Sequence, residues 1–96
     1  MKYYELDIAE KSYQLRLTTS NAIELEEKNH TKLLDFIEDY SIKSVTTLLM
    51  YCVRGTNKTF SKDEATTLMD NLLEKYSLDE IINNIIYEVL VISGFL

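Results

Sequence analysis

The amino-acid sequence predicts a single α+β domain over residues 1–96, with an N-terminal antiparallel β-hairpin (residues 1–18) followed by a bundle of four to five helices (residues 20–96). The first observation behind this fold class is an alternation of apolar and polar side chains at the start of the chain. The second is a pair of Ser-x-x-Glu capping boxes, which begin at Ser61 and Ser77. The third is the 3.6-residue spacing of apolar side chains along the last three helical segments. A chain of this length supports one hydrophobic core.

Residues 3–8 and 12–18 are the two predicted strands, because each places apolar side chains at every second position. The short connection Ala9-Glu10-Lys11 favours antiparallel pairing, although it holds no Asn-Gly or Asp-Gly pair to fix the turn type. Tyr3 points opposite to Tyr4, so one of them lies on the outer face, and Tyr3 is a candidate interface residue. The side chains predicted to share one face are Tyr4, Leu6, Ile8, Tyr13, Leu15 and Leu17.

Two short helices are predicted after the hairpin. Side-chain oxygens in Thr18–Asn21 can accept from free N–H groups at a helix start, and the acidic residues that follow suit the positive end of the helix dipole. We expect the first helix over about residues 20–28. The apolar residues of 32–40 predict a second short helix or a single turn, with Asn29-His30-Thr31 leading into it.

Three longer helices, over residues 42–54, 62–76 and 78–92, are predicted to form the core. Gly55 stands at the C-cap position of the first of them. The capping boxes at Ser61 and Ser77 start the other two, and no proline interrupts any of them.

The charge balance argues against two classes of partner. Sixteen acidic and ten basic residues give a formal charge of -6 and a pI near 4.7, which disfavours nucleic acid and anionic lipid. No apolar run approaches the ~20 residues needed to cross a bilayer. The single cysteine and the lack of a signal-like opening predict a reducing cytoplasm.

The residue types that usually carry catalysis are scarce in this chain. His30 is the only histidine and has no second ligand at metal-binding spacing, so an exposed loop position is favoured. Cys52 lies on an apolar stripe, where a buried thiol is favoured. The sequence therefore predicts no enzyme, and no catalytic, cofactor or metal site, but a protein that binds other proteins.

The segment Val89–Leu96 is apolar around the whole helix instead of along one stripe. One interpretation is a helix that ends inside the core, with Gly94 as a left-handed cap and Phe95 folded back. The other is an exposed apolar end that awaits a partner or a second copy of the chain. The candidate interface residues are Tyr3, Val91, Ile92, Phe95 and Leu96.

Three segments resemble the small tail assembly chaperones of long-tailed phages and prophages of Gram-positive bacteria. They are Tyr3–Ile8, Tyr13–Thr19 with the following Ala22–Glu26, and Val91–Leu96. The chain departs from the usual pattern after the first helix, where many members have a glycine-containing turn and this sequence has Asn29-His30-Thr31-Lys32.

The resemblance implies a non-enzymatic protein of the host cytoplasm that accompanies the tape measure protein, and as a further candidate the tail tube protein, during tail assembly. It also implies that a longer product can arise by ribosomal frameshifting, and self-association into a homo-oligomer is a further expectation. The alternative hypothesis is a phage-encoded acidic adaptor or inhibitor that occupies a groove on a host protein.

Overall fold

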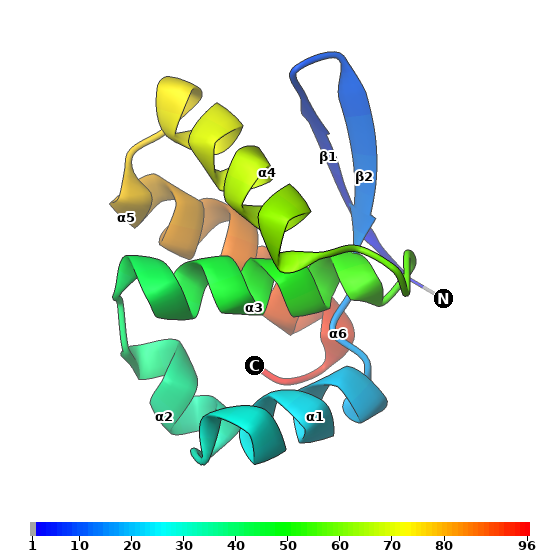
Figure 1. Cartoon of the computed structure of the whole chain (residues 1–96), viewed down its shortest axis with the longest axis vertical. Helices are drawn as coiled ribbons and strands as arrows, with labels where there is room; N and C mark the ends of the chain where they lie inside the picture. The colour runs from blue at the N-terminus through cyan, green and yellow to red at the C-terminus, as the bar shows by residue number, and fades with distance from the viewer. Residues whose placement is uncertain (1) are drawn as a thin grey trace.

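The predicted order of elements is present in the computed structural model, which describes residues 2–96 (Figure 1). These residues form a two-stranded antiparallel hairpin followed by five helices, so the α+β fold class is confirmed. The strands are β1 (Tyr4–Ile8) and β2 (Lys11–Leu15). The first four helices are α1 (Thr19–Asn29), α2 (Leu33–Glu38), α3 (Ile42–Arg54) and α4 (Lys62–Lys75). The last helix is continuous and consists of α5 (Leu78–Glu80), the π-helical segment η1 (Ile81–Ile86) and α6 (Tyr87–Ser93).

The hairpin turn consists of two residues, since Ile8 pairs with Lys11. Ala9 and Glu10 both have positive φ, at 52° and 64°. A type I′ turn requires this conformation at both central positions, and its right-handed twist matches that of the paired strands. Neither alanine nor glutamate favours the left-handed region, so this turn is locally strained.

Replacing Ala9 by asparagine together with Glu10→Gly is expected to raise the free energy of unfolding by about 1 kcal/mol, because both new residues accept positive φ. Urea denaturation followed by circular dichroism measures the change. Ala9→Val serves as the opposite control and should lower stability, since a β-branched residue resists positive φ. A urea denaturation midpoint that the double substitution Ala9→Asn with Glu10→Gly leaves unchanged would contradict this account of the turn.

Strand β2 ends at Leu15, earlier than the predicted residue 18. The N–H of Arg16 donates to the carbonyl oxygen of Cys52 in α3 at 2.9 Å, so the backbone turns from the hairpin to the helix at this residue. Thr56 Oγ1 also donates to the Gln14 carbonyl oxygen at 2.6 Å. These hydrogen bonds with α3 and with the loop that follows it determine where β2 ends. Leu15 and Leu17 are buried, as predicted.

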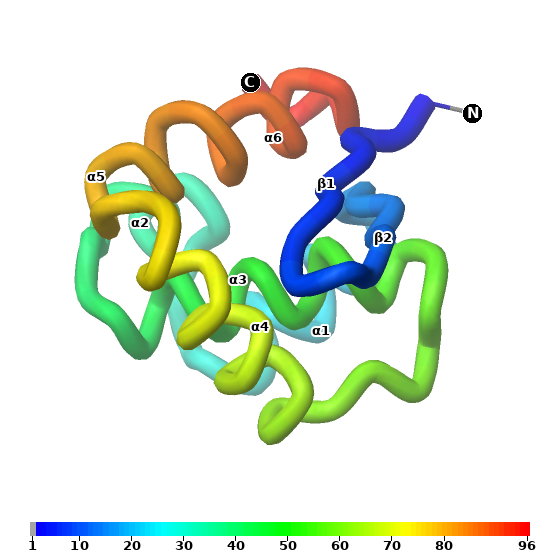
Figure 2. The backbone as a smooth tube through the Cα atoms, turned by 90° about the horizontal axis from the view of Figure 1, so that it is seen from above, coloured from blue at the N-terminus to red at the C-terminus, as the bar shows by residue number. Residues whose placement is uncertain are grey.

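Helix α3 is the centre of the fold. It contacts α1, α2, α4, β2 and η1, and Figures 1 and 2 show it surrounded by these elements. One hydrophobic cluster joins the hairpin to all five helices of the described chain. Leu6, Ile8, Leu15 and Leu17 of the predicted hairpin face are buried, and Tyr4 and Tyr13 pack partly buried against the cluster, so the predicted face is confirmed.

Both predicted capping boxes are present. Ser61 accepts from the Glu64 N–H while the Glu64 carboxylate accepts from the Ser61 N–H, and Ser77 and Glu80 do the same. At the first helix, Thr18 is the N-cap and its side chain accepts from the Asn21 N–H. The predicted starts of these helices therefore hold to within one residue.

The segment Asn29-His30-Thr31 differs from the prediction, which made it the lead-in to the second helix. Asn29 is the last residue of α1, and His30 caps this helix in the left-handed conformation with φ 52°. The His30 and Thr31 N–H groups both donate to the Glu26 carbonyl oxygen. A left-handed cap satisfies carbonyls that a helix end leaves free, and glycine is the residue that most often adopts it.

A candidate protein-binding groove

The two residues considered for chemistry lie apart from any site. His30 is exposed at the end of α1, and Cys52 is completely buried in α3. Within residues 2–96, no group of three His, Cys, Asp or Glu side chains is arranged to hold a metal ion. No helix in the same range combines the length and apolarity needed to span a membrane.

Burial raises the pKa of the Cys52 thiol to about 12, so the thiol stays protonated at neutral pH. We expect a thiol-specific reagent to leave Cys52 unmodified in the native protein at pH 8 and to react fully in denaturant. Mass spectrometry of the labelled protein tests this. Rapid labelling without denaturant would mean that α3 is accessible to solvent.

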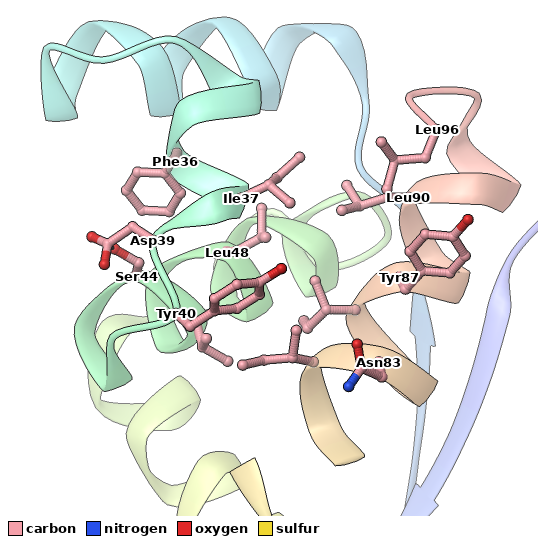
Figure 3. A pocket seen from close by; sticks show the side chains of 13 residues that line it. Phe36, Ile37, Asp39, Tyr40, Ser44, Leu48, Asn83, Tyr87, Leu90 and Leu96 are labelled. Carbon is pink, nitrogen blue, oxygen red and sulfur yellow. The ribbon is translucent and has the colours of Figure 1, made fainter. Parts of the chain in front are cut away.

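A concave apolar feature lies between α2 and α3 on one side and η1 and α6 on the other, and it is called here the α2–α6 groove. Its volume is about 60 Å³. Figure 3 shows Phe36, Ile37 and Tyr40 on one wall facing Asn83, Tyr87 and Leu90 on the other, with Leu96 at the edge. The remaining lining residues are Asp39, Ser44, Val45, Leu48, Ile82 and Ile86.

Two exposed tyrosines frame the groove. Tyr40 lies between α2 and α3, and Tyr87 is the first residue of α6. Both residues are more than half exposed, at 60% and 52%. Large, half-covered aromatic side chains beside an apolar depression are typical of protein interfaces, where they anchor the contact.

One wall carries an ordered negative charge. Ser44 Oγ donates to Asp39 Oδ2 at 2.7 Å, and the Ser41 N–H donates to Asp39 Oδ1 at 3.3 Å. The hydrogen bond from Ser44 is the main reason that the pKa of Asp39 is lowered. Asp39 therefore stays ionised at neutral pH, and its carboxylate places a negative charge at the rim of the groove.

The other wall is shaped by the π-helical segment. The Tyr87 N–H donates to the Ile82 carbonyl oxygen five residues earlier, so the helix widens over Ile81–Ile86. A wider turn changes the angular spacing of the side chains, and Ile82, Asn83, Ile86 and Tyr87 all reach the groove while Ile81 and Ile85 stay buried. Segments of this kind occur often at functional sites.

The predicted interface residues do not all come together. Leu96 lines the α2–α6 groove and Val91 is exposed on α6, while Ile92 and Phe95 are half-buried and Tyr3 is exposed just before β1. Gly94 has φ 90° and the Phe95 N–H donates to the Leu90 carbonyl oxygen, which is the left-handed cap of the first interpretation. The exposure of Val91 and Leu96, at 40% and 48%, is what the second interpretation expects.

No family model, curated protein or solved structure matches this chain. The functional assignment therefore depends on the groove itself and on the sequence resemblance.

Sequence reasoning did not single out Tyr40 and Tyr87. Tyr87 carried a usable signal, because it lies off the apolar stripe of its helix and a large aromatic residue on a polar face is informative. Tyr40 carried little signal, since it belongs to a loop whose position depends on how α2 packs.

Proposed function

We propose that this protein is a phage tail assembly chaperone that binds the tape measure protein in the host bacterial cytoplasm. The observation that carries the proposal is the α2–α6 groove, with exposed Tyr40 and Tyr87 beside it and Leu96 at its edge. The resemblance to that family supports the same role, and it rests on the segments Tyr3–Ile8, Tyr13–Thr19 with the following Ala22–Glu26, and Val91–Leu96.

The size of the groove favours a protein partner. A volume of about 60 Å³ is far below the ~300–1,000 Å³ of typical small-molecule sites. It suits one apolar side chain projecting from the surface of another protein. A helical rod such as the tape measure protein presents apolar side chains along its length, and uncovered rows of them promote aggregation.

The charge of the protein suits a solubilising role. A formal charge of -6 keeps a complex with an apolar rod soluble, and many weakly bound copies along one rod gain from avidity. Asp39 at the rim favours a lysine or arginine close to the inserted apolar side chain. Binding to the tail tube protein and self-association are further parts of this proposal.

Co-expression of the protein with a phage tape measure protein tests the function. We expect the tape measure protein to become soluble and to co-purify with this protein, and Leu96→Asp to reduce the recovered complex. Co-purification with a host protein instead, and none with the tape measure protein, would favour the acidic adaptor or inhibitor.

A further inference from the structure

A second apolar depression, called here the α3–α4 groove, lies between α3 and α4 and reaches the end of α1. Its volume is about 660 Å³. Ile42 and Leu73 line it and are 51% and 40% exposed, while Met50 and Met69 form buried parts of its floor. Exposed large apolar side chains next to such a floor mark a surface suited to a partner.

The groove follows the two helices lengthwise. Ile42, Thr46 and Met50 line it from α3 at four-residue intervals, and Met69 and Leu73 line it from α4 with the same interval. Residues four apart lie on one face of a helix, so each helix gives a straight row of side chains. The valley between two packed helices is the geometry that receives the apolar ridge of a third helix.

The hydroxyl protons of two of the three threonines that line the groove are already used within their own helices. Thr46 Oγ1 donates to the Ile42 carbonyl oxygen at 2.7 Å, and Thr66 Oγ1 donates to the Lys62 carbonyl oxygen at 3.0 Å. These hydroxyls therefore donate no hydrogen bond to a small polar ligand. Their methyl groups are compatible with an apolar helix face.

The charge around this groove is opposite to that of the whole chain. Lys28, Lys43 and Lys62 line it against a single acid, Asp70, although the chain has sixteen acidic and ten basic residues. The Debye length is about 8 Å at physiological ionic strength, so the charges that line the groove act on a docked segment more strongly than charges farther away. The α2–α6 groove carries the ionised Asp39 instead, so the two grooves select partners of different charge.

We propose that the α3–α4 groove binds an amphipathic helix of a partner protein, whose apolar stripe is flanked by aspartate and glutamate. The three lysines pair with the flanking acids. The apolar side chains that α3 and α4 contribute to the groove cover the apolar stripe of the bound helix. This site is separate from the α2–α6 groove and does not depend on the tape measure protein being the partner there.

Two synthetic peptides of about 18 residues, long enough to form a helix on binding, test the proposal. Both carry the same leucine stripe, flanked by glutamates in one and by lysines in the other. NMR titration of the full chain is expected to show that the glutamate peptide binds and shifts the signals of Ile42, Met69 and Leu73. Added salt should weaken this binding.

The combined Lys43→Glu and Lys62→Glu substitutions should lower the affinity of the protein for the glutamate-flanked peptide about tenfold, because each charge reversal removes an attraction and adds a repulsion. The matched control, Lys11→Glu with Lys58→Glu, changes the net charge equally outside the groove and should alter affinity less than about twofold. Equal binding of both peptides, no binding of either, or shifts confined to other surfaces would overturn the proposal. It would also be overturned by a dimer in sedimentation that the Lys43 and Lys62 reversals dissociate, since a second copy would then occupy the groove.

Discussion

Gly55→Ala is expected to lower the free energy of unfolding by about 3 kcal/mol or more, because the added methyl group meets backbone atoms that have no room to yield. A Cβ at this position would overlap the carbonyl oxygen of Arg16 and lie 2.9 Å from its carbonyl carbon. The Arg16 backbone has little freedom to move, because its N–H donates to the Cys52 carbonyl oxygen and the Gln14 carbonyl oxygen, two residues earlier, accepts from Thr56 Oγ1. The added methyl group would push the hairpin away from α3.

Chemical denaturation of Gly55→Ala measures this cost, and Gly94→Ala is the matched control. Gly94 has φ 90°, but apart from Gly94 and its two chain neighbours no heavy atom of the described residues lies within 4 Å of the place that an added Cβ would take. Its replacement should therefore cost only about 1 kcal/mol of backbone strain. Equal effects of the two substitutions would contradict the close packing of the hairpin on α3.

Substituting both tyrosines of the α2–α6 groove, as Tyr40→Ala with Tyr87→Ala, is expected to weaken binding to the tape measure protein by about 30-fold or more. This corresponds to about 2 kcal/mol, the loss typical when an anchoring aromatic residue is removed from an interface. The effect on folding should stay small, because both residues are more than half exposed in the free protein.

Point substitutions separate binding from folding better than removal of the last turn does. Truncation after Leu90 would delete Val91 and Leu96, but also Gly94 and Ser93. The Ser93 hydroxyl accepts from the Leu17 N–H at 2.9 Å, which ties the last helix to the segment after the hairpin. A truncated protein would lose this bond together with the candidate interface.

Local signals in the sequence predicted much of the fold. Helix α3 has the predicted bounds, since a strong apolar stripe from Ile42 ends where Gly55 follows. The capping boxes at Ser61 and Ser77 placed two further helix starts, because both partners of each box lie within four residues. The Cys52 thiol is buried as expected from its place on the stripe.

Features set by distant contacts were not predicted. The early end of β2 depends on hydrogen bonds to Cys52 and from Thr56, which lie about forty residues away. Gly55 is the C-cap of α3 as predicted, but its backbone is right-handed with φ -61°, so the close approach of Arg16, and not a left-handed cap, accounts for glycine there. The π-helical segment Ile81–Ile86 keeps the apolar spacing of an ordinary helix, so periodicity alone could not reveal it.

The α2–α6 groove was beyond sequence reasoning for the same reason. Its walls come from α2 and from the last helix, which are about forty residues apart along the chain. The terminal Leu96 was the only lining residue among the predicted interface positions, and the tyrosines beside it depend on how these elements pack.

The dissociation constant of the purified protein for a soluble helical fragment of the tape measure protein, measured by calorimetry, tests the central claim most directly. Tyr40→Ala with Tyr87→Ala, and Leu96→Asp separately, are compared with Ile23→Asp and Leu34→Asp, which change exposed apolar side chains outside the groove. We expect tight binding that only the groove variants weaken, by about 30-fold for the tyrosine pair. Undetectable binding by the unmodified protein, or equal losses in groove and control variants, would contradict the account.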